Sequence, residues 1–265
     1  MPRSLSPLDV KPSLPAYPSW LRRKFRLTKA VHAKADYDLV SSSLKRQFEK
    51  SAFWLDVLSS FNDWESAYRL SHSDYGLLVG QPPTVVTKDW DRFLTKTWRH
   101  NVHNNANWPD PPRGDWLLPP RWYGAINDVV RTLLVVKYMD GVPFLGERLE
   151  YAAAQHGCSV QSDLLGTPTG YYAGHVVIRH AVELRTSGWR LESREVPVEI
   201  QITTQLHEVI RRLLHRHYEK RRVADGDDYT WQWDQSSEEF QANYLGHILH
   251  YVDGQILLTR DAEPG

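Results

Sequence analysis

Apolar residues recur at two different periods along the chain, and the change of period separates predicted helices from predicted strands. Residues 20–72 contain no proline or glycine, and their apolar side chains recur every three to four positions, which predicts two or three helices. Trp90, Leu94 and Trp98 have the same spacing, so another helix is expected around them. Residues 1–19 contain five prolines among mostly polar residues and are predicted to form an extended arm.

The second half of the chain alternates between predicted strands and helices. A proline-rich loop over residues 104–122 leads into a run of valine and leucine that predicts a buried strand. The later predicted elements are a short helix over 146–155, a turn and strand within 167–186, a strand over 194–204, a basic helix after 204, and an amphipathic helix that ends near Gly254 before a last strand over 255–260. This order predicts an α+β fold with helices on the faces of a sheet.

Composition narrows the class of protein. The 265 residues are 41% hydrophobic and 24% charged, which excludes a fibrous chain and a wholly disordered one. Lys and Arg number 32 and Asp and Glu number 32, so affinity for a polyanion must come from a local patch. Cys158 is the single cysteine, which is typical of a reducing compartment, and we expect a cytoplasmic protein. No apolar run reaches the ~18 residues of a membrane span, so no membrane association is expected.

One strongly basic stretch lies near the N-terminus. Arg22, Arg23, Lys24 and Arg26 follow Trp20 and are interleaved with apolar residues. Such a stretch is either a solvated helix face or a surface that binds a phosphate backbone, and the sequence leaves both interpretations open.

Two acidic residues are associated with predicted strands. The alternation in residues 194–204 sends its apolar side chains, Val196, Val198, Ile200 and Ile202, to one face, and Glu199, Gln201 and Thr203 to the other. Asp128 precedes a near-continuous apolar strand, where a carboxylate must be hydrogen-bonded or hold a cation. If Asp128 and Glu199 lie close together on neighbouring strands, they form a site for Mg²⁺. The alternative is a cap and a solvated strand residue.

Aromatic and histidine residues give two further candidates. The turn at Gly170 presents Tyr171 before a strand, where its ring can stack on a base or simply alternate with Tyr172 as a strand residue. The basic helix carries a stripe of residues that suits a polyphosphate, namely His207, Arg211, His215 and Arg222. The histidines His207, His215 and His217 are also possible zinc ligands, although no cysteine accompanies them.

Taken in order, four motifs resemble the synthetase domain of the RelA/SpoT family, the (p)ppGpp synthetases. The resemblance covers roughly residues 85–255. The family's Lys-x7-Lys-x2-Arg helix is matched by Lys88, Lys96 and Arg99, and its Asp at a strand entrance by Asp128. Its Gly-Tyr-x3-His loop is matched by Gly170, Tyr171 and His175. Its Glu-x-Gln-Ile-x-Thr motif and the helix after it are matched by Glu199, Gln201, Ile202, Thr204, His207, His215 and Tyr218.

The resemblance implies a nucleotidyltransferase-like mixed β-sheet flanked by helices, with a helical N-terminal extension. The implied domains are an arm over 1–19, the extension over 20–84 and the synthetase over 85–260. The implied reaction is transfer of pyrophosphate from ATP to a ribose 3′-hydroxyl, with AMP leaving. Asp128 and Glu199 would be catalytic and would hold Mg²⁺. The residues implied to bind ATP are Lys88, Lys96, Arg99, Arg131, Gln201 and His207, and those implied to bind the acceptor are Gly170, Tyr171 and His175.

Several positions depart from the family pattern. Val86 and Thr203 stand where many members have arginine, the loop reads GYYAGH, and Arg131 comes two residues earlier than the arginine of housekeeping members. The GYYA-type loop and the strand that begins Asp-x-x-Arg resemble the toxic small alarmone synthetases, which are the toxins of toxin–antitoxin pairs, whereas Val86 and Thr203 leave an inactive module open.

Three functions follow from this subgroup. The main expectation is a pyrophosphokinase that modifies the 3′-terminal adenosine of tRNA and so blocks aminoacylation, with Arg22, Arg23, Lys24 and Arg26 contacting the tRNA backbone. A second is a synthetase that makes (p)ppGpp or (pp)pApp from mononucleotides. A third is an inactive module that binds RNA or an antitoxin protein. A cognate antitoxin is a partner implied by the resemblance alone.

Overall fold

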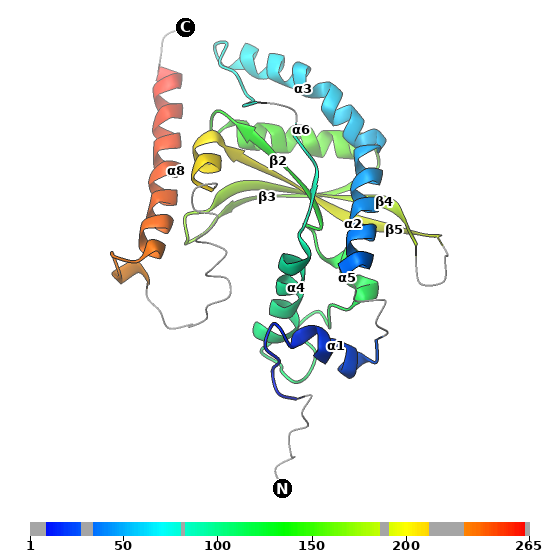
Figure 1. The fold of residues 1–265 in the computed structure, drawn as a ribbon. Helices are drawn as coiled ribbons and strands as arrows, with labels where there is room; N and C mark the ends of the chain where they lie inside the picture. Colours follow the sequence, from blue (N-terminus) through cyan, green and yellow to red (C-terminus); the bar gives the residue numbers. More distant parts are fainter. Residues whose placement is uncertain (1–8, 28–33, 81–82, 186–190, 212–230, 263–265) are drawn as a thin grey trace. The chain divides into compact units, whose positions relative to one another are not determined.

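The computed structural model describes residues 9–27, 34–80, 83–185, 191–211 and 231–262 (Figure 1). Its helices are α1 (Tyr17–Phe25), α2 (Lys34–Glu49), α3 (Ala52–Ser71), α4 (Trp90–Trp98), the π-helix η2 (Arg99–His103), α5 (Pro119–Ala125), α6 (Gly141–Gln155), the 3₁₀-helix η3 (Trp231–Trp233) and α8 (Glu238–Ala262). Residues 205–211 are also helical. Its strands are β1 (Val86–Thr87), β2 (Val130–Val136), β3 (Ser159–Gly166), β4 (Tyr172–Arg185) and β5 (Leu191–Thr204).

The strands form a five-stranded sheet in the order β1-β2-β5-β4-β3 (Figure 1). Strand β1 pairs antiparallel with β2, and this register sets Val86 opposite Arg131. The four apolar residues of the predicted core face of β5, Val196, Val198, Ile200 and Ile202, are all buried, but Glu199 and Thr203 on the other face are buried as well, so burial does not alternate along the strand. The mixed sheet with flanking helices confirms the predicted α+β class.

The chain divides into two compact units, each assembled from three segments. Unit 1 consists of Met1–Lys50, Val85–Arg131 and Arg179–Val198, and unit 2 of Ser51–Thr84, Thr132–Ile178 and Glu199–Gly265. The domain boundary that the sequence suggested after residue 84 stays a prediction.

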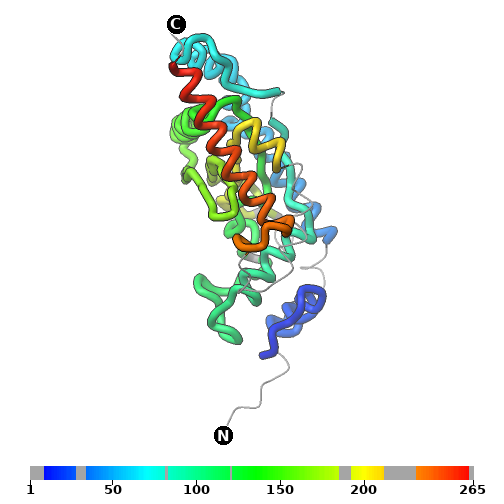
Figure 2. Tube along the Cα trace, turned by 90° about the vertical axis from the view of Figure 1, so that its left-hand side faces the viewer, coloured from blue at the N-terminus to red at the C-terminus, as the bar shows by residue number. Residues whose placement is uncertain are grey.

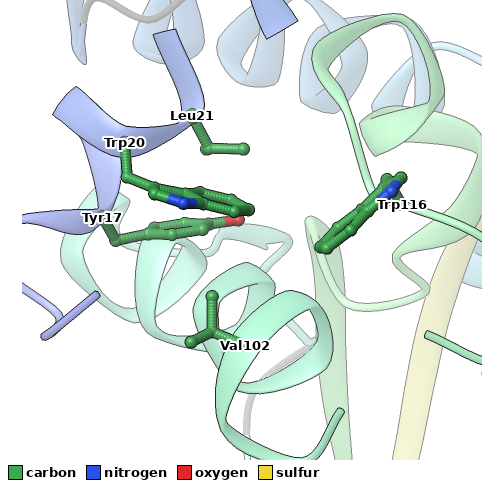
Figure 3. Packing of buried hydrophobic residues seen from close by; sticks show 5 residues of the cluster. All are labelled: Tyr17, Trp20, Leu21, Val102 and Trp116. Carbon is green, nitrogen blue, oxygen red and sulfur yellow. The ribbon is translucent and has the colours of Figure 1, made fainter. Parts of the chain in front are cut away.

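An aromatic cluster forms one core of unit 1. Tyr17, Trp20 and Leu21 of α1 are buried against Val102 of η2 and Trp116 of the proline-rich loop (Figure 3). The rings of Tyr17 and Trp20 stack with centroids 6.0 Å apart. The expectation of an extended arm up to residue 19 is therefore wrong at its end, because α1 begins at Tyr17. Proline is tolerated in the first turn of a helix, where its missing N–H has no partner to lose.

Unit 2 contains a helical layer of α3 and α6. Ser51 caps α3, since its hydroxyl accepts a hydrogen bond from the N–H of Trp54 at 3.1 Å. Helix α6 packs against α3 and β3. At Gly141, the first residue of α6, a Cβ would lie 2.8 Å from the side chain of Leu77, so a larger residue would push these elements apart.

The prediction for the C-terminal region is wrong beyond residue 254. Helix α8 does not end near Gly254, and 255–260 is not a strand, because α8 continues without interruption to Ala262 (Figure 2). Its last turn is fixed by Arg260, whose buried guanidinium donates to Asp140 at 2.8 Å and to the hydroxyl of Tyr68 at 2.7 Å. These contacts join positions more than a hundred residues apart, so local patterns could not indicate them.

Two smaller elements are also missing from the predictions. Helix α5 forms inside the expected loop, with prolines in its first turn. Strand β3 is almost wholly exposed and therefore has no apolar alternation for a sequence pattern to detect. No helix in the described part of the chain combines the length and apolarity needed to cross a membrane.

Candidate active site

Asp128 of unit 1 lies between two lysine ammonium groups. Lys88 Nζ is 2.6 Å from its Oδ2, and Lys96 Nζ is 2.7 Å from its Oδ1. The backbone delivers both lysines: the N–H of Lys88 donates to the carbonyl of Val129 at 2.8 Å, and α4 carries Lys96. Both oxygens of the carboxylate are therefore held by ion pairs at the entrance of β2.

Charge compensation dominates the electrostatics of this cluster. Burial alone would raise the pKa of Asp128, but Lys96 and Lys88 outweigh it and lower that pKa to about 2. Burial lowers the pKa of Lys88, which is 6% exposed, and Asp128 opposes that shift. The carboxylate is thus fully ionised at neutral pH.

Helix α2 packs against the segments that carry Lys88 and Lys96. The hydroxyl of Tyr37 donates to the carbonyl of Lys88 at 2.7 Å, and its ring lies 4.4 Å from that of Phe93 on α4. Because both contacts are buried, Lys88 has little freedom to swing away from Asp128. Unit 1 therefore presents a rigid carboxylate with two cations attached to it.

A cavity of about 390 Å³ lies beside Lys96 in unit 1. Its lining residues are Lys96, Arg99, His100, Asn104, Pro112 and Arg113. The sequence prediction found Lys96 and Arg99, but it missed His100 and Arg113, since neither belongs to a motif. Three of the predicted ATP-binding residues of unit 1 thus form two overlapping groups, Lys88 and Lys96 around Asp128 and Lys96 and Arg99 around the cavity.

In unit 2, Tyr171, His175 and Glu199 form a hydrogen-bonded chain. His175 Nδ1 lies 2.9 Å from Glu199 Oε1, and its Nε2 lies 2.8 Å from the hydroxyl of Tyr171. Since an ionised carboxylate only accepts, His175 donates its Nδ1–H to Glu199, and its Nε2 is hydrogen-bonded to the hydroxyl of Tyr171. The structure thereby brings together three residues that the sequence placed in two different motifs.

Glu199 has a second partner on its own strand. Gln201 Nε2 donates to Glu199 Oε2 at 2.8 Å. Gln201 was predicted to bind ATP, which stays a prediction, and in the structure it orients the carboxylate of Glu199. Arg131 is half-buried in β2, and its predicted contact with ATP also stays a prediction.

The loop that carries Tyr171 is fixed by Gly170. This residue has φ +74°, and its N–H donates to the carbonyl of Thr167 at 3.0 Å. A Cβ at Gly170 would collide with the backbone carbonyl of Asn243 on α8. Only glycine fits both the conformation and the close approach, so α8 sets the position of the Tyr171 loop.

His207 occupies a buried aromatic site in unit 2. Its ring lies 5.6 Å from that of Tyr172 and 5.9 Å from that of His250. Burial, together with His250, lowers the pKa of His207 to about 4, so its ring is neutral at pH 7. Its predicted contact with ATP stays a prediction, and it would be a contact by a neutral imidazole.

The zinc interpretation finds no support in the described residues. Among them, no group of three histidine, cysteine, aspartate or glutamate side chains is placed to hold a metal ion. His215, His217, Tyr218 and Arg222 lie outside the described residues.

The basic stretch of α1 is partly used for packing. Lys24 Nζ lies over the rings of Trp20, Trp108 and Trp116, 4.7 Å from the centroid of Trp116. It also donates to the carbonyl of Pro109 at 2.9 Å. Arg23 and Arg26 are exposed. Lys24 therefore stabilises the aromatic cluster, and the arginines carry the exposed charge of this stretch.

Solved structures with the same fold include small alarmone synthetases. Small alarmone synthetase 1 from Bacillus subtilis superposes with a TM-score of 0.54 at 16% identity, over 86% of this chain and 96% of that one. A GTP pyrophosphokinase family protein from Streptococcus pneumoniae gives 0.52 at 16% identity, over 85% and 89%. The Bacillus subtilis synthetase 1 bound to its product pppGpp gives 0.51 at 15% identity, over 82% and 92%.

Comparisons of the sequence itself find no such relatives. No family model matches the chain, and no curated protein matches it. The likeness therefore lies in the fold, which is that of the small alarmone synthetases.

Proposed function

We propose that the chain is an ATP-dependent pyrophosphokinase that transfers the terminal diphosphate of ATP to the ribose 3′-hydroxyl of a nucleotide, as a small alarmone synthetase does. The observation that carries the proposal is Asp128, buried and ionised between Lys88 and Lys96, in a chain with this fold. Phosphoryl transfer depends mainly on positioning and on compensation of oxygen charge. A fixed carboxylate with attached cations is suited to both.

The carboxylates of Asp128 and Glu199 fit Mg²⁺. This ion is usually held in proteins by one or two carboxylates and completes its shell with water and substrate phosphates. Asp128 supplies such oxygens in unit 1 and Glu199 supplies them in unit 2, and each carboxylate is hydrogen-bonded within its own unit. When bound, Mg²⁺ would neutralise negative charge on the phosphate oxygens.

Each group of residues then has a distinct role in the reaction. Lys88, Lys96 and Arg99 bind the phosphates of ATP, and Tyr171 stacks on the acceptor base. Glu199 takes the proton of the 3′-hydroxyl as that oxygen bonds to the β-phosphorus. The bond from the β-phosphorus to the oxygen of the α-phosphate breaks, and AMP leaves with that oxygen.

A free nucleotide is the first choice of acceptor. Small alarmone synthetase 1 from Bacillus subtilis, which has this fold, is bound to its product pppGpp in one of its structures, and we extend that acceptor class to this chain. The 3′ end of tRNA is the second candidate, favoured by the exposure of Arg23 and Arg26 on and beside α1. A role as a toxin with an antitoxin partner belongs to that second candidate.

One experiment tests the reaction and its acceptor together. The protein is incubated with Mg²⁺ and ATP labelled on the β-phosphate, with GDP, GTP, AMP and deacylated tRNA each in a separate reaction. The proposal expects label on a mononucleotide together with release of AMP, and loss of both in Asp128→Asn. Asp110→Asn, a change of the same kind at an exposed residue, is the matched control. Label on tRNA would select the second candidate, and label on none would contradict the proposal.

A further inference from the structure

The cavity beside Lys96 concentrates positive charge in unit 1. Lys96, Arg99 and Arg113 line it with cationic groups, and the side-chain amide of Asn104 adds a hydrogen-bond donor. Among the residues that the structure describes, no acidic side chain lines it. A cavity of about 390 Å³ with this lining is suited to an anion larger than a single phosphate.

The charges in the cavity are only partly compensated. Lys96 forms an ion pair with Asp128. Within the described part of the chain, the side chains of Arg99 and Arg113 form no ion pair and no hydrogen bond. Two unpaired guanidinium groups that face the same cavity repel each other, and an anion between them would turn that repulsion into attraction.

The π-helix η2 places two of the lining residues. Arg99 begins η2, and the N–H of Asn104 donates to its carbonyl at 2.8 Å, five residues back. This wider turn sets Arg99 and His100 at the same wall of the cavity, and segments of this kind recur at functional sites. His100 Nε2 also lies 3.1 Å from the carbonyl of Asp115, which ties η2 to the loop that carries Arg113.

The loop that carries Arg113 is anchored at its base. Asn101, which is fully buried, pairs with the backbone of Leu117, donating to its carbonyl at 3.0 Å and accepting from its N–H at 2.8 Å. Gly114 has φ +85°, and the N–H of Asp115 donates to the carbonyl of Pro112 at 2.9 Å. The turn at Arg113 is therefore closed by hydrogen bonds.

Aromatic packing holds the same loop against α1. Trp108 and Trp116 both contact Trp20, with centroids 5.2 and 5.7 Å away, and Lys24 lies over all three rings. Figure 3 shows Trp116 facing the rings of Tyr17 and Trp20. The N-terminal helix thus fixes the loop that presents Arg113.

We infer that this cavity binds the polyphosphate chain of a nucleoside triphosphate, and that Arg113 is a binding residue for it. The inference rests on the proposed function, because it assumes a triphosphate substrate. It adds a cation from outside the Lys-x7-Lys-x2-Arg pattern, held in place by the N-terminal aromatic cluster. A planar guanidinium can bind two phosphate oxygens at once, which makes Arg113 more than a general source of charge.

Binding measurements without turnover test this inference. Inorganic tripolyphosphate, a non-hydrolysable ATP analogue and GTP are each titrated into the protein by calorimetry. Arg113→Gln should weaken tripolyphosphate binding by roughly ten- to a hundredfold, the range for loss of a charged hydrogen bond. Arg113→Lys should recover part of that loss. The control is Arg194→Gln, which removes an exposed arginine that pairs with Glu192 and lines no part of the cavity.

The outcomes separate the inference from the proposed function. A weakening shared by tripolyphosphate and the ATP analogue assigns the cavity to the donor, and one shared by tripolyphosphate and GTP assigns it to a triphosphate acceptor. Equal binding by wild type, Arg113→Gln and Arg113→Lys would overturn the inference, even if pyrophosphate transfer were observed. If tripolyphosphate binding depends on Arg113 but no acceptor is labelled, the proposed function is wrong, while the inference that the cavity binds a polyphosphate is kept. Thermal melts of each variant exclude misfolding as the cause.

Discussion

The two candidate clusters use opposite means to hold a carboxylate. Asp128 of unit 1 is fixed by two ion pairs, whereas Glu199 of unit 2 is held by His175 and Gln201 through hydrogen bonds. In the first arrangement two lysine cations pair with one carboxylate, and the excess positive charge favours anionic ligands. The second fixes direction and, through His175, reaches the aromatic ring of Tyr171. This difference agrees with the roles proposed above, in which the Asp128 cluster binds phosphate and the Glu199 cluster orients the acceptor.

The largest expected difference between the clusters is in stability. Asp128→Asn leaves Lys88 buried without its counter-charge, which should cost about 3–5 kcal/mol of unfolding free energy. Glu199→Gln replaces a carboxylate held by His175 and Gln201 with a neutral amide of the same shape and should cost roughly 1 kcal/mol. Urea denaturation of both variants measures this, and equal losses would remove the proposed distinction. In transfer assays, Asp128→Asn should lower the rate on the order of 10²–10³-fold, so that neither product is detected within the time of a wild-type assay.

Acid should weaken the Asp128 cluster in a defined window. Its pKa falls from the ordinary 3.8 to about 2 in the folded protein, so its contribution is complete above pH about 4 and is lost as pH falls towards 2. A shift of this size corresponds to about 2 kcal/mol. The stability difference between wild type and Asp128→Asn should therefore shrink by that amount between pH 5 and 2. A difference that stays constant with pH would show that the ion pairs do not stabilise the fold.

A change at Gly170 should act on the acceptor side alone. Gly170→Ala forces an alanine into φ +74° and against α8, at a cost of roughly 1–3 kcal/mol. The loop with Tyr171 should shift, raising the KM for the acceptor while the affinity for the ATP analogue is unchanged. Gly157→Ala, also at positive φ but with open space around it, is the control for backbone strain. If Gly170→Ala also weakened binding of the ATP analogue, the assignment of the Gly170 loop to the acceptor alone would be contradicted.

The smallest effect is expected at the tyrosine hydroxyl. Tyr171→Phe keeps the ring and loses the hydrogen bond to His175, which should raise the acceptor KM only a few-fold, by about 1 kcal/mol or less. Tyr171→Leu loses the stacking surface and should cost about 1–3 kcal/mol. If both variants behave alike in steady-state kinetics, the ring does not contact the acceptor.

Part of the site could be predicted because short-range patterns determine it. The alternation in β5 and the apolar run after Asp128 were sufficient to place Glu199 on a strand and Asp128 at the entrance of another. The spacing of Lys88, Lys96 and Arg99 placed them on and beside one helix. These features depend on residues close in sequence, so periodicity could reveal them.

The remainder depends on contacts between distant segments. The continuation of α8 depends on Arg260 reaching Asp140, and the packing of Lys24 depends on Trp108 and Trp116. Arg113 joins the cavity because a buried asparagine and the aromatic cluster shape its loop. No local pattern signals such contacts. The sequence therefore shows how many basic residues lie near the N-terminus, but not which of them pack against other segments and which stay exposed.

The proposed reaction transfers a diphosphate and not a single phosphate. The most direct measurement is the nucleotide balance in a reaction of the protein with Mg²⁺, β-labelled ATP and GDP or GTP. The account predicts one AMP formed for each labelled acceptor, and neither product with Asp128→Asn. Formation of ADP, or release of label as free phosphate or pyrophosphate without any labelled acceptor, would contradict it.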